Sequence, residues 1–396
     1  MSDERHDGPE LVDWDFAVQT ASRFVRPGPD ISRAQARDVV AELRAGARSS
    51  ESHVRGYTGL HAATATAPVV VIDRPGWVQA NADGFRAIMR PLIAKLTEKR
   101  GTPGGLARVI GSRVTGFEAG ALLGYLAGRV LGQFDPFWPN GGLAAGAPQR
   151  MPTPQSGPVS AAPTGRPIPT GGGSAELARR PPAGRMLLVA PNIVHTEREL
   201  EVDPHHFRLW VCVHEETHRV QFTAVPWMRD HLHSEIRALI DATEVDPSAL
   251  AAMLRDGVER AARMARGDDD ISLLDIIQTP AQREIVGRIT ATMSLLEGHA
   301  DVVMDGVGPE VIPTVDVIRT RFNERRKGGG TLDQVLRKLL GLDAKMRQYR
   351  DGATFVRGAL ERVGMDGLNA VWTSPNTLPS LPEIGDPAAW VRRVHG

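Results

Sequence analysis

Apolar residues recur at helical spacing along most of this 396-residue chain, and short continuous apolar runs are few. Capping residues and prolines bound the helical pattern; Ser32 and Gln35, for example, have the spacing of a capping box. The runs Val69–Ile72 and Met186–Ala190 predict strands. We therefore predict an α+β fold that is mostly helical. The predicted helices cover residues 77–99, 204–222, 226–244, 247–266, 280–304, 315–326, 332–340 and 344–363.

A shift in composition divides the chain into three parts. From residue 139 to residue 184, glycine, proline, alanine and serine dominate, and too few apolar side chains are present to form a packed core. This segment is predicted to be a flexible linker or loop. We therefore expect a helical N-terminal domain over residues 1–138 and a second domain over residues 185–396.

Glycines recur at every fourth position within Ala119–Phe134, from Gly120 to Gly132. On a helix they would share one face, where the absence of side chains permits close packing. The apolar stretch is too short to span a bilayer, and Arg129 interrupts it. We predict a buried helix pressed against a neighbouring helix, with no stable membrane insertion.

The predicted helix 204–222 carries the pattern H-E-x-x-H, with histidines at 214 and 218 and a glutamate at 215. His214 and His218 lie on the same face of a helix, so both imidazoles can bind one metal ion. Glu215 would lie beside that ion, where its carboxylate can accept a proton from a bound water. The apolar run 209–213 directly before the motif indicates that this helix is buried.

A catalytic zinc site usually has a third protein ligand, and the predicted helix 280–304 offers one. Glu297 and Asp301 lie one turn apart on this helix. We expect Glu297 to bind the metal and Asp301 to accept the free N–H of a ligand histidine. Gly298 would let this helix approach the histidine helix closely. His299 is the rival ligand, but it lies far round the helix from Glu297, so we expect it to be a core or supporting histidine.

These motifs resemble an uncharacterised bacterial family of zincin-like hydrolases, also labelled zinc-dependent metalloproteases. The resemblance implies a zincin-like metallopeptidase catalytic domain behind a helical N-terminal region, with Zn²⁺ as cofactor. Some members carry a label for deazaflavin coenzyme biosynthesis. The Glu297–Asp301 pair also resembles the third-ligand helix of thermolysin-like peptidases, although here 79 positions separate His218 from Glu297. The segments that carry the family resemblance are 214–222, 296–301, 322–326, 341–350 and 369–376.

The resemblance also suggests how a substrate would be held. Zincins commonly place a strand edge beside the active cleft, and the segment Arg185–His195 is the expected edge by that resemblance. The oxyanion formed in the reaction needs a hydrogen-bond donor. Tyr349 is the first choice, because zincins often use tyrosine or histidine in this role. Arg350, Arg325 and His233 are the other candidates.

The leading functional hypothesis is a zinc-dependent hydrolase, most simply a metallopeptidase with Glu215 as general base. Three alternatives remain open at this point: hydrolysis of a non-peptide amide, a zincin-fold scaffold without turnover, and a helical interaction protein without metal. A scaffold would need the metal ligands but not the glutamate, so the presence of Glu215 favours catalysis.

Composition narrows the partners and the compartment. Lys and Arg together number 47, as do Asp and Glu, so no net charge attracts nucleic acid or an anionic membrane. Cys212 is the single cysteine and is expected to pack in the core rather than bind metal. The polar N-terminal residues contain no signal-peptide pattern, so a cytoplasmic location is expected. A peptide or protein substrate is the expected partner, and the sequence does not indicate an oligomeric state.

Overall fold

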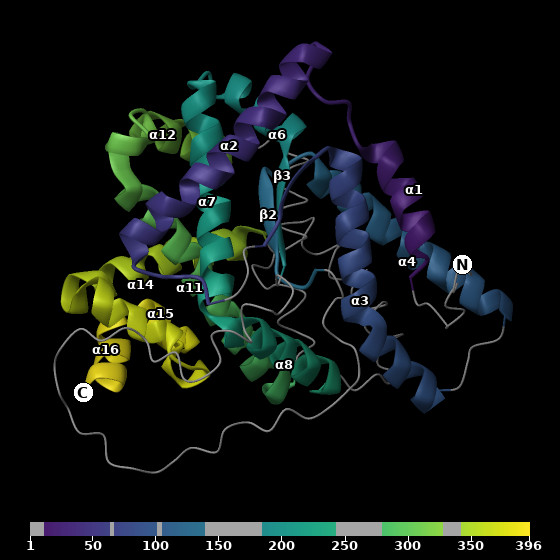
Figure 1. Cartoon of the computed structure of the whole chain (residues 1–396). Helices are drawn as coiled ribbons and strands as arrows, with labels where there is room; N and C mark the ends of the chain where they lie inside the picture. The colour runs from purple at the N-terminus through teal and green to yellow at the C-terminus, as the bar shows by residue number, and fades with distance from the viewer. Residues whose placement is uncertain (1–11, 64–66, 101–104, 139–183, 243–278, 328–341) are drawn as a thin grey trace.

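The computed structural model describes residues 12–63, 67–100, 105–138, 184–242, 279–327 and 342–396. Helices surround a small three-stranded sheet, which confirms the mostly helical α+β class (Figure 1). The elements are α1 (Trp14–Phe24), α2 (Arg33–Thr58), β1 (Val69–Ile72), α3 (Arg74–Arg100), α4 (Gly105–Ala127), β2 (Gly132–Asp135), β3 (Arg185–Val189), α6 (Ala190–Glu199), α7 (Pro204–Ala224), α8 (Pro226–Ala242), α11 (Pro280–Val311), α12 (Val315–Lys327), α14 (Leu342–Leu368), two short 3₁₀ helices (Asn369–Trp372 and Pro375–Thr377), α15 (Leu381–Gly385) and α16 (Pro387–His395).

Most predicted helices in the described residues are confirmed. Ser32 and Gln35 form the predicted capping box at the start of α2. Helix α11 passes its predicted end at residue 304, and its span to Val311 includes a kink at Gly308, where φ is 71°. The predicted helices 247–266 and 332–340 and the predicted linker, apart from Gly184, lie outside the described residues.

The sheet has the order β1-β3-β2, so β3 is the central strand. Strand β1 is parallel to β3 and β2 is antiparallel to it. Both edges of β3 are therefore occupied, and α6 begins at Ala190. The expectation that Arg185–His195 offers a substrate-binding edge is wrong, because backbone groups already paired on both sides cannot bind an extended peptide.

Strand β2 also corrects the prediction of a continuous helix over residues 119–134. Helix α4 ends at Ala127, and Gly132–Asp135 pairs with β3. The regularly spaced glycines therefore lie in two different elements, the helix α4 and the strand β2. A Cβ at Gly120 would lie 2.4 Å from the Ala17 carbonyl oxygen of α1. The glycine in α4 therefore allows this helix to pack closely against α1, as predicted. Gly132, in contrast, lies in the strand.

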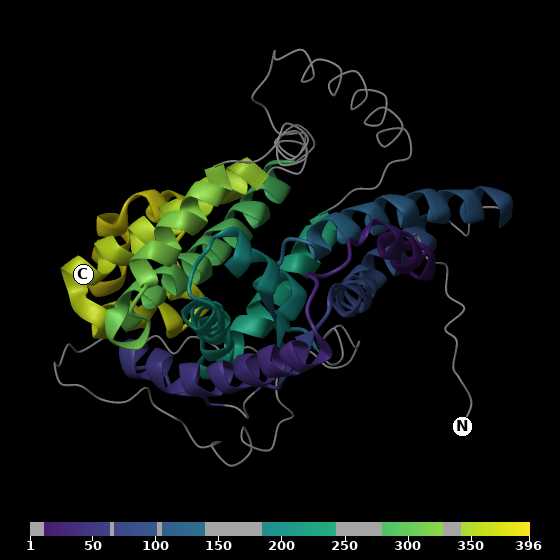
Figure 2. The same ribbon diagram turned by 90° about the horizontal axis from the view of Figure 1, so that it is seen from above.

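Helix α7 lies between the sheet and the helices α11 and α14, and α2 packs along it (Figure 1). The main hydrophobic core combines residues from all of these elements, including Leu43, Val213, Leu295 and Phe355. A second hydrophobic core joins α1, α3 and α4 to the other face of β3, where Leu187 and Val189 are buried. Figure 2 shows α1, α3 and α4 at the opposite end of the molecule from the C-terminal helices. The division into domains at residue 185 stays a prediction, although α2 and β1 pack directly on later elements.

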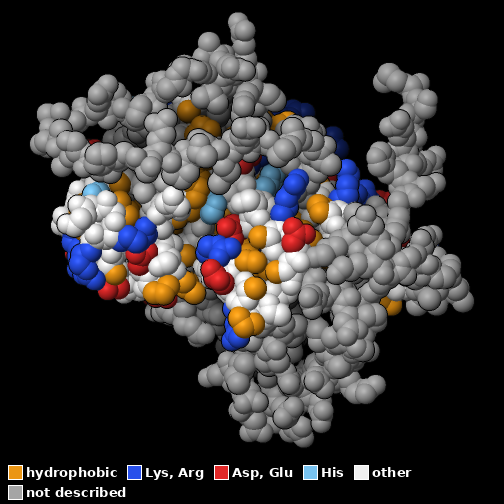
Figure 3. Space-filling model, turned by 90° about the horizontal axis from the view of Figure 1, so that it is seen from below, with side chains coloured by type: hydrophobic (Ala, Val, Ile, Leu, Met, Phe, Trp, Pro, Cys, Tyr) orange, Lys and Arg blue, Asp and Glu red, His pale blue; other side chains and the backbone are white. Residues whose placement is uncertain are grey.

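The described surface carries both signs of charge. In the view of Figure 3, Lys and Arg side chains lie interspersed with Asp and Glu side chains. This agrees with the equal totals of basic and acidic residues in the chain. Within the described residues, no helix combines the length and apolarity needed to cross a membrane.

Candidate metal centre

The local sequence of α7 explains why it can present metal ligands from a rigid position. Asp203 caps the helix by accepting a hydrogen bond from the backbone N–H of His206, and Pro204 occupies the first helical position. Residues 210–213 are buried in the main core. Cys212 is fully buried with its thiol 3.6 Å from the Leu43 carbonyl oxygen, so it packs against α2 as expected.

Three potential ligand atoms converge between α7 and α11. The Nε2 atoms of His214 and His218 are 3.3 Å apart. An oxygen of the Glu297 carboxylate lies 3.8 Å from the first and 3.7 Å from the second. Among the described residues, this is the cluster of histidine, cysteine and carboxylate side chains with the geometry to hold a metal ion. The sequence-predicted ligand set is therefore brought together, although Glu297 comes from a distant helix.

The spacing of these atoms fits zinc. Two ligands at zinc–ligand distances of about 2.0–2.1 Å and a tetrahedral angle are separated by roughly 3.3 Å. The three observed separations lie at or slightly above this value. Two imidazole nitrogens and one carboxylate oxygen are also the donor set of a catalytic zinc site that keeps a fourth position for water. The residues present therefore fit a zinc ion.

Gln221 supports His218 from the next turn of α7. The His218 Nδ1 atom lies 3.0 Å from Gln221 Oε1. The Gln221 nitrogen lies 2.9 Å from the Leu296 carbonyl oxygen and 3.0 Å from His299 Nδ1. His299 is buried beside Trp372, and burial, together with the charge of His218, lowers the pKa of His299 to about 3. His299 is therefore connected to the ligand His218 through Gln221 and is not itself one of the three candidate ligands.

Asp301 does not take the predicted role. Its carboxylate binds Arg319 at 3.0 Å and lies 3.7 Å from Arg357. The Nδ1 atom of His214 lies 3.1 Å from the Met304 sulfur instead. The expectation that Asp301 accepts a hydrogen bond from a ligand histidine is therefore wrong. One turn beyond Glu297, the helix points the aspartate toward two arginines, which are stronger partners than a neutral imidazole.

Gly298 also has a different neighbour from the one expected. A Cβ at Gly298 would lie 2.1 Å from the carbonyl carbon of Gly352, and a Cβ at Gly352 would lie 2.0 Å from the Ser294 carbonyl oxygen. These two glycines therefore allow α11 to pack closely against α14 rather than against α7. This contact fixes the helix that carries Glu297.

Glu215 is buried directly beside the ligand cluster. Its side chain is 5% exposed, and burial together with the negative charge of Glu297 raises its pKa well above the usual value. Strand β2 approaches it closely: a Cβ at Gly132 would lie 2.5–2.6 Å from Glu215 Cγ, Cδ and Oε1. Gly132 therefore leaves the space that the carboxylate occupies. A divalent cation at the cluster would favour the ionised carboxylate.

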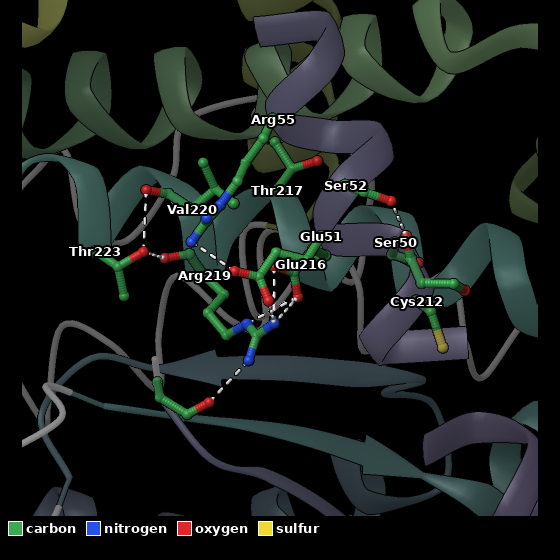
Figure 4. Close-up of polar contacts among 12 residues, drawn as sticks. Ser50, Glu51, Ser52, Arg55, Cys212, Glu216, Thr217, Arg219, Val220 and Thr223 are labelled. Carbon is green, nitrogen blue, oxygen red and sulfur yellow. Dashed lines mark hydrogen bonds and ion pairs between the residues drawn. The ribbon is translucent and has the colours of Figure 1, made fainter. Parts of the chain in front are cut away.

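The face of α7 that bears Glu216 and Arg219 fixes the helix to its surroundings. Glu216 and Arg219 form a buried two-point ion pair, and Arg219 also binds Glu51 of α2 and the Ala67 carbonyl oxygen (Figure 4). Burial raises the pKa of Glu216 to about 7, although Arg219 opposes this shift. Breaking such a buried pair by removing one partner is costly, so the network holds the ligand-bearing helix in place.

The four oxyanion candidates stay predictions. Tyr349 and Arg350 lie on α14, and their side chains are outside the described residues. Arg325 forms an ion pair with Glu199 at 2.8 Å. His233 stacks on Phe137 with ring centroids 4.3 Å apart.

Three residues near the centre are not predicted from the sequence as parts of the site: Gly132, Gln221 and Met304. Gln221 had a signal, because it follows His218 by three positions and so lies one turn further on the same face of the helix. No sequence spacing indicates Gly132 or Met304. Gly132 contacts Glu215, and Met304 contacts His214, only through tertiary packing.

Comparison with known proteins agrees with this geometry. The profile of the family described as zincin-like metallopeptidase matches residues 12–391. The chain belongs to this zincin-like family. Its structure is also similar to the crystal structure of a hydrolase candidate with a novel fold from Chloroflexus aurantiacus. That protein is 27% identical, with a TM-score of 0.64, and the match covers 97% of this chain and 99% of the other. No curated protein matches this chain.

Membership of the zincin-like family covers nearly the whole chain, so it applies to the helical N-terminal region as well as to α7 and α11. The family and the similar hydrolase candidate support a hydrolase that uses a metal ion, usually zinc in this class. The His-His-Glu cluster is where the described residues can hold that ion.

Proposed function

We propose that this protein is a zinc metallopeptidase in which His214, His218 and Glu297 hold the metal and Glu215 is the general base. The observation that carries the proposal is the convergence of three donor atoms, 3.3–3.8 Å apart, beside a buried glutamate. When bound, zinc would polarise a substrate carbonyl and lower the pKa of a bound water.

Glu215 would carry the proton in both halves of the reaction. As a carboxylate, it accepts one proton from the water whose oxygen forms a bond to the carbonyl carbon. It then donates that proton to the leaving nitrogen as the carbon–nitrogen bond breaks. The buried position of Glu215 suits this exchange, because burial raises its pKa and so makes the carboxylate a stronger proton acceptor.

The edge of β2 supports a peptide rather than a smaller amide as substrate. Strand β2 pairs with β3 along one edge, and no strand among the described residues pairs with its other edge. Gly132 in β2 touches Glu215, so a peptide added to this edge would pass beside the general base. An extended peptide binds such an edge through its backbone, which only a substrate with several peptide units can exploit.

A peptide-library digestion tests the proposed reaction. We expect purified protein loaded with one equivalent of zinc to cleave a subset of peptides of about eight residues or more, and dialysis against a chelator to abolish cleavage. Re-addition of zinc should restore it. Mass spectrometry of the products gives the cleaved bond. Cleavage of small non-peptide amides without cleavage of any peptide would support the alternative amidohydrolase function.

The close contact between Gly132 and Glu215 predicts a specific defect in Gly132→Ala. The added methyl group would overlap the glutamate side chain, so the carboxylate must move. A displacement of about 1 Å at a catalytic group can lower kcat by roughly 100-fold. Zinc affinity should stay within a few-fold of wild type, since the ligand atoms are not touched.

Gly128→Ala is the matched control, because a Cβ there would lie 3.9 Å from the Tyr125 carbonyl oxygen, an ordinary van der Waals contact. Steady-state kinetics and zinc titration of both variants separate the two effects. Equal kcat values for Gly132→Ala and Gly128→Ala would show that Glu215 does not need the space beside β2.

A further inference from the structure

We propose that Gln221 is a positioning residue that orients His218 for metal binding, and that Leu296 and His299 in turn fix the Gln221 amide. The inference rests on the proposed zinc site and adds the residue that sets the tautomer of one ligand. It concerns three contacts: Gln221 to His218, to Leu296 and to His299.

The backbone carbonyl of Leu296 decides which way the Gln221 amide points. A carbonyl oxygen can only accept, so the amide group 2.9 Å away must be the nitrogen. The amide oxygen is then the atom that faces His218 Nδ1 at 3.0 Å. An amide oxygen can only accept, so Nδ1 of His218 carries a proton. In a neutral imidazole this leaves the lone pair on Nε2, which is the atom that points at the cluster.

His299 accepts the second hydrogen bond of the Gln221 amide nitrogen. The Gln221 nitrogen has two N–H groups; one faces the Leu296 carbonyl and the other lies 3.0 Å from His299 Nδ1. His299 must accept this hydrogen bond, so its own proton is on Nε2. Both amide protons and the amide oxygen of Gln221 are therefore used, and a flipped amide would place its oxygen against the Leu296 carbonyl.

Burial protects the three hydrogen bonds of Gln221 from water. Gln221 is fully buried and His299 is 1% exposed, so water has little access to replace any of the three contacts. A buried polar side chain without partners is unfavourable, and an apolar residue would fill this space without needing any. The three contacts of Gln221 therefore indicate a role beyond packing. The side chain also links α7 to α11, because Leu296 precedes the third ligand, Glu297. One residue thus connects the second histidine to the helix of the carboxylate ligand.

Three variants test the inference. Gln221→Met keeps an unbranched side chain of similar length but removes both the acceptor and the donors. Gln221→Glu keeps an oxygen acceptor for His218, and its second oxygen can donate to the Leu296 carbonyl once the buried carboxyl is protonated. Thr223→Val is the matched control: Thr223 is also buried on α7, and its hydroxyl binds the Arg219 carbonyl rather than a ligand. The readout is the zinc dissociation constant, measured by competition with a chromophoric chelator, together with the thermal stability of each metal-free protein.

We expect Gln221→Met to weaken zinc binding by roughly 10–100-fold, as is typical when an outer hydrogen-bond partner of a ligand histidine is lost. Gln221→Glu should bind zinc within a few-fold of wild type, because one oxygen of its protonated carboxyl accepts the same His218 proton while the O–H donates to the Leu296 carbonyl. Thr223→Val should match wild type. Equal zinc affinity for wild type and Gln221→Met would overturn the inference, as would equal weakening in Gln221→Met and Gln221→Glu.

If the methionine variant does not fold, nitrogen NMR of the metal-free wild-type protein decides: the positioning role predicts that neutral His218 carries its proton on Nδ1, and a proton on Nε2 would overturn the inference. The wild-type titration separates this inference from the proposed function. A wild-type protein that binds no zinc removes the metal site itself, whereas zinc binding in wild type that is insensitive to residue 221 removes only the role of Gln221.

Discussion

Replacing Glu215 with glutamine is expected to leave one zinc bound per chain and to lower turnover by roughly 10²–10⁴-fold, the usual contribution of a general base. The amide has nearly the same shape as the carboxylate, so it fits the space beside Gly132. It cannot accept the proton of the attacking water. Because Glu215 lies next to the ligand atoms without being one of them, metal affinity should change little. Zinc content and kcat are measured on the same preparation.

Glu216→Gln is the matched control for this experiment. It makes the same chemical change one residue along α7, where the side chain pairs with Arg219 rather than facing the ligands. We expect reduced stability, because a buried ion pair is weakened, but turnover close to wild type in the folded protein. If Glu215→Gln were as active as wild type, Glu215 would not be the base.

Replacing Glu297 with alanine is expected to weaken zinc binding more than any change at Gln221. The variant removes a direct ligand, so the loss should exceed the roughly 10–100-fold that an outer partner contributes. It also removes the negative charge that raises the pKa of Glu215. Competition titration with a chelator measures the affinity, and hydrolysis at saturating zinc shows whether two histidines alone sustain turnover.

Glu284→Ala provides the control on the same helix. Glu284 is exposed near the start of α11 and pairs with Arg288, so its loss leaves the cluster untouched. Zinc affinity should equal that of wild type in Glu284→Ala. Unchanged affinity in Glu297→Ala would transfer the third-ligand role to another residue.

The parts of this site that follow from local sequence were predictable. Helix α7 has a capping aspartate, a proline at its first position and an apolar run, and the spacing of His214 and His218 places both on one face. Glu297 could be proposed because its helix resembles a known third-ligand helix. Its distance from the histidines could not be predicted, since 79 positions of chain separate Glu297 from His218.

The parts that depend on tertiary packing were missed or misplaced. The sequence predicts that Asp301 supports a histidine, but arginines on α12 and α14 pair with it, and neither arginine's position can be known from the sequence. The four-residue spacing of the glycines predicts a helix that runs on through the residues of strand β2. Only pairing with β3 shows that Gly132 belongs to the sheet and lies beside Glu215.

X-ray absorption at the zinc edge, on protein purified without chelator, shows whether His214, His218 and Glu297 hold zinc. We expect about one zinc per chain, bound by nitrogen and oxygen atoms at about 2.0–2.1 Å with an imidazole signature. In His218→Ala or Glu297→Ala the spectrum should lose a ligand or the metal. Less than about one tenth of an equivalent of zinc in the wild type, or a sulfur ligand at about 2.3 Å, would contradict the account.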